Sequence, residues 1–119
     1  MPRAMSQSTS RKRRKKILKQ SKGYRLGRRN QIRAARNGVL KGLQYAYRDR
    51  RNRKRDFRKL WILRIGAAAK AEGISYSELM GGLNKAGVSI NRKQLSELAI
   101  NDQQAFQDLC NIAREAMAA

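Results

Sequence analysis

The basic stretch YRDRRNRKRDFRKLW contains the residues whose types and spacing most clearly indicate a chemistry. Eight of the twelve residues from 48 to 59 are lysine or arginine, and only Asp49 and Asp56 are acidic. Ion pairs of Asp49 with Arg53 and of Asp56 with Lys59 have helical spacing, but each contributes only about 0.2–0.5 kcal/mol. Because these pairs cannot offset the repulsion among the other cations, we expect the stretch to bind phosphates, which releases condensed counterions.

Tyrosine rings accompany the cations and indicate which polyanion is bound. Tyr24, Tyr45 and Tyr47 lie within residues 1–70, where arginine outnumbers lysine. Guanidinium groups bind phosphate in a bidentate manner and stack on bases, and tyrosine rings stack on unpaired bases. Folded RNA exposes more base faces than duplex DNA does, so the pattern favours RNA. Packing of Tyr45 and Tyr47 against neighbouring helices is an equally open alternative.

The positive charge is concentrated in one part of the chain. The formal net charge of +21 consists of +23 in residues 1–70 and −2 in residues 71–119. So much charge of one sign repels itself in a compact protein, which predicts a polyanionic partner. The segregation also predicts two units, a basic arm at residues 1–56 and a globular domain at residues 57–119.

No arrangement of residues predicts catalysis, a metal or a cofactor. The chain has no histidine, which excludes histidine-based proton transfer and His-ligated metal sites. Its single cysteine excludes an internal disulfide and a Cys-rich zinc site, and neither GxxxxGK[ST] nor GxGxxG occurs. No run approaches the roughly 18 apolar residues of a membrane span. The N-terminal composition is also typical of an organellar transit peptide, but it continues to Lys70, which favours a mature arm.

Helices are the elements expected to position the cations. Residues 1–10 show no periodicity and are expected to be extended or disordered. Ser10 as N-cap and Gly23 after the last turn bracket a short helix. A long helix is predicted from Arg25 to about Glu72, because apolar residues recur there every three or four positions. These apolar residues are Ile32, Ala35, Val39, Leu43, Ala46, Phe57, Leu60, Trp61, Ile65 and Ala68.

The long helix carries cations where its apolar stripe would continue. Those positions are Arg50 and either Arg53 or Lys54. Glycine lowers helix propensity by about 1 kcal/mol relative to alanine, so three glycines weaken the first half. They are Gly27, Gly38 and Gly42. Near the end of the helix we take Phe57 and Trp61 as core, with base stacking by Trp61 as the less favoured alternative.

The last third of the chain has the pattern of short, capped helices. Gly73 is expected to end the long helix. Ser75 with Glu78, and Asn91 with Gln94, have the spacing of capping boxes and predict two short helices. A final helix is expected to begin at Asn101 or Asp102 and to turn an apolar face inward. That face consists of Phe106, Leu109, Cys110, Ile112 and Ala113.

Two features of this part need a packing explanation. Gly81 and Gly82 together cost about 2 kcal/mol in helix propensity, which a close approach of another helix or of an RNA backbone would explain equally well. Cys110 lies four residues after Phe106 and is interpreted as a small buried hydrophobe, not as a reactive thiol. The patterns together predict an all-α fold, in which a long basic helical arm precedes a small globular helical domain.

Three segments resemble a known family. RKRRKKILKQSKGYR, YAYRDRRNRKRDFRKLWILRI and GISYSELMGGLNKAGVSINRKQLSELAI, in this order, closely resemble the bacterial and organellar large-subunit ribosomal protein numbered twenty over about residues 11–100. The resemblance implies a basic arm threaded through large-subunit ribosomal RNA, a small domain resting on that RNA, and a role in early subunit assembly. It implies neighbouring ribosomal proteins and, in some members, the protein's own messenger RNA as partners. A cytoplasmic ribosome is expected in preference to an organellar one.

The resemblance and the charge pattern together give the expected RNA contacts. Carried over by position are Lys15, Lys16, Lys22, Tyr24, Arg25, Arg48, Arg50, Arg51, Arg53, Lys54, Arg55, Arg58, Arg92 and Lys93. The remaining cations expected to bind RNA are Arg11, Lys12, Arg13, Arg14, Lys19, Arg28, Arg29, Arg33, Arg36 and Lys59. Residues 5–10 depart from the family's more basic start. The alternatives are a histone-like protein that compacts DNA and a helical scaffold for an acidic protein.

Overall fold

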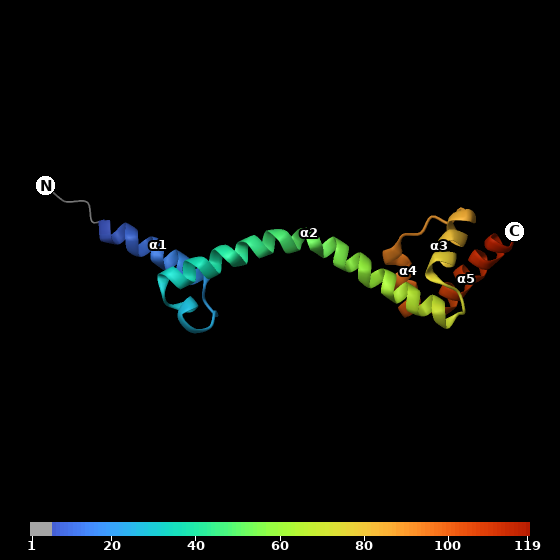
Figure 1. Cartoon of the computed structure of the whole chain (residues 1–119), viewed down its shortest axis with the longest axis horizontal. Helices are drawn as coiled ribbons and strands as arrows, with labels where there is room; N and C mark the ends of the chain where they lie inside the picture. The colour runs from blue at the N-terminus through green and yellow to red at the C-terminus, as the bar shows by residue number, and fades with distance from the viewer. Residues whose placement is uncertain (1–5) are drawn as a thin grey trace. The chain divides into compact units, whose positions relative to one another are not determined.

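The computed structural model describes residues 6–119, and every regular element in that range is helical (Figure 1). The predicted all-α fold is therefore confirmed. The elements are α1 (Ser6–Gln20), the 3₁₀ helix η1 (Leu26–Arg29), α2 (Ile32–Ala71), α3 (Tyr76–Lys85), α4 (Arg92–Asn101) and α5 (Gln103–Ala118). The chain divides into two compact units, the first ending at Arg51 and the second running from Asn52 to Ala119.

Helix α1 begins earlier than its expected cap. The sequence placed residues 1–10 outside any helix, but residues 6–10 already belong to α1, which is a correction; residues 1–5 lie outside the described range. Because proline occurs only at position 2, no helix breaker lies between residues 6 and 10. The helix ends as predicted, since Gly23 has φ +92° and reverses the chain.

The sequence predicted that the long helix begins at Arg25, but α2 begins at Ile32. Leu26 has φ +55°, in the left-handed region that an L-residue rarely adopts and that cannot continue an α-helix. Leu26 begins η1, and the backbone N–H of Gln31 donates to the carbonyl of Gly27 over 2.8 Å. Apolar periodicity carries no signal for such a backbone reversal, so the sequence could not place it.

The glycines in the first half of α2 accommodate the ring of Tyr24. A Cβ added to Gly38 would lie 3.0 Å from Cε2 of Tyr24, and one added to Gly42 would lie 2.9 Å from its hydroxyl oxygen. Beside this seat, Ala35 and Val39 are the buried apolar residues among positions 8–51. Leu43, which the stripe predicted to face a core, is 59% exposed because no element of this unit covers it.

The second unit has a continuous apolar core. It is formed by Ile65, Ala69, Ile74, Leu79, Leu83, Leu95, Phe106, Cys110 and Ala113. Both predicted capping boxes are present and begin α3 and α4, and Asp102 caps α5 by accepting from the backbone N–H of Ala105. Gly73 and Gly87 have φ +78° and +72°, so they end α2 and α3 as glycine C-caps do.

Close packing of α3 on α5 explains one of the two adjacent glycines. A Cβ on Gly82 would lie 2.7 Å from Cα of Ala113, so α5 approaches α3 more closely there than a side chain would allow. At Gly81 the nearest atom is Sδ of Met117, at 4.0 Å. The two helices lie side by side in Figure 1. Helix packing, and not an RNA backbone, therefore accounts for Gly82.

Several residues of the second unit that were expected in the core are less buried than predicted. Phe57 is 49% exposed and Ile112 is 39% exposed, while Trp61 is half-buried against the edge of the core. The stripe of α2 joins the core only from Trp61 onward, where Ile65 is fully buried in one cluster with residues of α3, α4 and α5. Phe57 lies one turn before that covered part.

Candidate nucleic-acid interface

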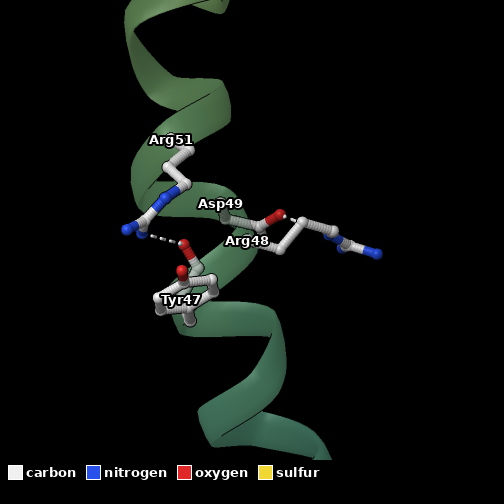
Figure 2. Close-up of polar contacts among 4 residues, drawn as sticks. All are labelled: Tyr47, Arg48, Asp49 and Arg51. Carbon is white, nitrogen blue, oxygen red and sulfur yellow. Dashed lines mark hydrogen bonds and ion pairs between the residues drawn. The ribbon is translucent and has the colours of Figure 1, made fainter.

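Two arginines of the basic stretch lie over tyrosine rings of the same helix. The guanidinium carbon of Arg48 lies 4.4 Å from the ring centroid of Tyr45, and that of Arg51 lies 3.8 Å from the ring centroid of Tyr47. Arg51 also donates to the backbone carbonyl of Tyr47, as Figure 2 shows. Both tyrosines are about half exposed, so they support arginines and do not pack into a core. This contact holds each guanidinium group over its ring without neutralising its positive charge.

The helical spacing predicted an ion pair of Asp49 with Arg53, but Asp49 pairs with its neighbour Arg48 instead. Nε of Arg48 donates to Oδ1 of Asp49 over 2.9 Å (Figure 2). This hydrogen bond, with the charge of the carboxylate, raises the pKa of Arg48 above its ordinary value. It is the only ion pair among residues 8–119, whose side chains the structure describes, so the expected Asp56–Lys59 pair does not form either. The other cations of the stretch carry charge that no carboxylate of this part neutralises.

Two grooves in the first unit are lined by Tyr24 and by residues predicted to contact RNA. One groove, of about 1150 Å³, lies beside the turn after α1, and another, of about 650 Å³, lies along α2 between Arg28 and Lys41. The first is lined by the predicted contacts Lys15, Lys19, Lys22, Tyr24, Arg25 and Arg29. Arg33 and Arg36 line a smaller hollow of about 310 Å³. Exposed on α1, outside these hollows, are Arg11, Lys12, Arg13, Arg14 and Lys16.

A groove of about 750 Å³ in the second unit lies between α2 and α4. It is lined by Arg53, Lys54, Phe57, Arg58, Leu60, Trp61, Arg64, Lys93 and Glu97. Sequence reasoning missed Arg64 and Glu97. Arg64 follows Arg53, Phe57 and Trp61 at steps of four, four and three, so helical spacing from the basic stretch would have indicated it. Arg50, Arg55 and Lys59 are exposed on α2 outside this groove.

The two cations at the start of α4 have different surroundings. Nε of Arg92 donates to the hydroxyl oxygen of Tyr76 over 2.8 Å, so this side chain links the first turns of α4 and α3. Lys93 is exposed and lines the groove. Arg92 is therefore partly engaged inside the protein, and Lys93 is the more accessible of the predicted pair.

Three further features of the described residues concern thiol reactivity, metal binding and membrane insertion. Burial, followed by the charge of Glu72, raises the pKa of the Cys110 thiol, which fits its interpretation as a small buried hydrophobe. Across residues 6–119, no three His, Cys, Asp or Glu side chains gather as metal ligands would. No helix in the same range is long and apolar enough to cross a membrane.

Comparison with known proteins finds similarity along nearly the whole chain. The family model described as Ribosomal protein L20 matches residues 3–109. The large ribosomal subunit protein bL20 of Carboxydothermus hydrogenoformans is 58% identical over 115 residues, which is 97% of this chain and 98% of that protein. The protein of the same name from Pelotomaculum thermopropionicum is 61% identical over 114 residues, covering 96% and 97% of the two chains. That of Oceanobacillus iheyensis is 54% identical over 117 residues, covering 98% and 99%.

Proposed function

This chain belongs to the ribosomal protein L20 family, and we propose that it is a structural protein of the large ribosomal subunit that binds and organises ribosomal RNA during early assembly. The observation that carries the proposal is the extent of the match, which spans residues 3–109 and so includes every cation predicted to bind RNA in both units. Large-subunit ribosomal RNA and neighbouring ribosomal proteins are its partners. Such a role is structural and needs no catalytic group.

The arm that enters the RNA runs from residue 1 to residue 56, and residues 57–119 form the domain that rests on the surface of that RNA. This arm extends beyond the first compact unit, because Arg53, Lys54 and Arg55 are exposed cations of the same basic stretch. Two of its arginines, Arg48 and Arg51, have guanidinium groups already held over tyrosine rings. Oriented guanidinium groups lose less conformational entropy when they bind phosphate.

The finer features of the function follow from the same chemistry. The similar proteins come from bacteria, which supports a cytoplasmic ribosome as the site of action. Binding to the protein's own messenger RNA needs no further surface, since oriented cations and exposed rings recognise any RNA with unpaired bases. The histone-like alternative is not supported, since the relatives are large-subunit ribosomal proteins.

Co-sedimentation and competition test the function directly. A tagged copy of the full chain is expected to co-sediment with large subunits in a cell extract. At moderate salt, folded fragments of large-subunit RNA should displace a labelled ribosomal RNA fragment far better than duplex DNA of equal charge. Equal competition by the duplex, together with absence from the large subunit, would contradict the proposal.

A further inference from the structure

We propose that the groove between α2 and α4 binds one unpaired guanine of an RNA strand, with the flanking phosphates held by the groove's cations and the base edge held by Glu97. The inference rests on the proposed RNA-binding function and names a ligand for one part of it. Three features of the groove support the inference. They are two accessible aromatic side chains, several basic side chains and one unpaired carboxylate.

The aromatic rings give the groove a surface for a base. Phe57 is 49% exposed, its ring centroid lies 6.3 Å from that of Trp61, and the two ring planes are inclined by 37°. Phe57 adds little to the core, so core packing does not account for a large apolar side chain at this position. Unpaired bases stack on exposed aromatic side chains and thereby cover them from water.

The cations around these rings select a phosphate-bearing ligand. Five basic side chains and one acidic side chain line the groove. The basic ones are Arg53, Lys54, Arg58, Arg64 and Lys93. In an RNA strand the phosphates flank each base on both sides, which suits a groove where aromatic rings lie together with cations from two helices. An acidic peptide would satisfy the cations, but it would leave the rings without a stacking partner.

Glu97 supplies a means of selecting the base. Its carboxylate lines a groove of cations, yet it forms no hydrogen bond or ion pair with any side chain of residues 8–119. An ionised carboxylate only accepts hydrogen bonds, so it suits a base edge with adjacent donors. Guanine presents two adjacent donors, N1–H and N2–H, on its Watson–Crick edge. Uracil flanks its single N–H with two carbonyl oxygens, which a carboxylate repels.

The experiment uses the full chain and its own fluorescence. Trp61 is the only tryptophan, so its emission reports occupancy of this groove even while the arm binds RNA elsewhere. Titration with the single-stranded pentamers UUGUU, UUAUU, UUCUU and UUUUU gives a midpoint for each, and midpoints are compared because bases differ in quenching strength. We expect UUGUU to saturate the Trp61 signal at a concentration about tenfold lower than UUUUU, as one bidentate base contact allows.

Two variants separate the roles within the groove. Glu97→Ala should bring the four midpoints to within about threefold of one another, because the selecting carboxylate is lost while the rings and cations stay. Glu115→Ala removes the same charge from an exposed position of α5 outside the groove, and it should keep the guanine preference. Phe57→Leu, which keeps an apolar side chain without a ring, should weaken all four pentamers by roughly tenfold. Circular dichroism checks that each variant is folded.

The outcomes distinguish this inference from the proposed function. A guanine preference that survives Glu97→Ala, or pentamers that bind without changing Trp61 emission, would overturn the inference while leaving ribosomal RNA binding intact. A glutamate-rich peptide that displaces UUGUU at equal charge concentration and changes the emission equally would also overturn it. Failure of the chain to bind folded large-subunit RNA would instead refute the proposed function.

Discussion

At the scale of single residues, the contact of Gly82 with Ala113 makes two neighbouring glycines unequal. Gly82→Ala would force a methyl group against the backbone of α5, and overpacking of this kind costs about 1–3 kcal/mol or more of folding free energy. Gly81→Ala meets only Met117, at 4.0 Å, and should stabilise α3 by up to about 1 kcal/mol through helix propensity. Denaturant unfolding of the two variants, followed by Trp61 fluorescence, measures both. Equal effects would contradict the packing described here.

The capping box of α3 predicts that the contribution of Glu78 to folding stability depends on pH. The backbone N–H of Ser75 donates to Glu78, and this hydrogen bond lowers the pKa of the carboxyl group. A lowered folded-state pKa contributes stability above the ordinary value, and that contribution is lost as pH falls through the folded value. Glu78→Gln should therefore be less stable than the parent at pH 7, with the difference shrinking below about pH 4.3.

Thermal unfolding between pH 7 and pH 3 measures this difference. Glu115→Gln removes a carboxylate outside any capping box and serves as the control. A gap between Glu78→Gln and the parent that stays constant over the whole range would show that the charge of Glu78 has no part in the cap.

At the scale of elements, α2 combines a covered end with a bare basic stretch, and a double substitution separates the two. Arg50 and Arg53 are exposed, so Arg50→Ala with Arg53→Ala should leave the unfolding of the second unit nearly unchanged. The same variant should weaken RNA binding and reduce the slope of log K against log salt by about 0.9 per lost duplex phosphate contact, or about 0.7 on single strands.

A charge-matched variant tests whether position matters. Lys70→Ala with Lys85→Ala also removes two exposed positive charges, but from helix ends outside the basic stretch. Its salt slope should change less than that of the arginine pair. If the two variants lose the same slope, RNA binding depends on net charge alone and the contacts assigned to the stretch are wrong.

The elements also show which structures a sequence can reveal. The two capping boxes were predictable because their residues lie three positions apart and satisfy one another locally. The left-handed Leu26 and the seat of Tyr24 on Gly38 were not, because both depend on where another segment lies. The exposure of Phe57 was missed for the same reason: periodicity shows that a side chain lies on a stripe, but not how far its cover extends.

The candidate site was predictable in part. Charge and tyrosine content indicated the basic stretch, and the structure adds that Tyr45 and Tyr47 support arginines. Glu97 was not predictable, because a single carboxylate in a helix carries no signal until α4 is placed beside α2. Pairing of Asp49 was predicted with the wrong partner, since adjacent side chains can meet when both bend along the helix surface.

At the scale of the whole molecule, the two units differ in what supports them. The first unit buries few apolar side chains, Ala35 and Val39 among them, and carries dense positive charge, so we predict that residues 1 to about 45 are disordered until RNA binds. Circular dichroism of the free protein should report helix for roughly the last 60–70 residues, with a gain when ribosomal RNA is added. Hydrogen exchange locates the gain, and an arm already protected without RNA would refute the prediction.

The buried thiol of Cys110 allows opening of the second unit to be measured by thiol labelling. A thiol reagent attacks the thiolate, and here the side chain is inaccessible and its pKa is raised, so labelling has to wait until α5 separates from the core. With one cysteine in the chain, every labelled molecule has opened at that place. The labelling rate therefore measures how often the domain opens. Comparing this rate for the free protein with the rate in an assembled subunit would show by how much incorporation into the subunit slows the opening of the domain.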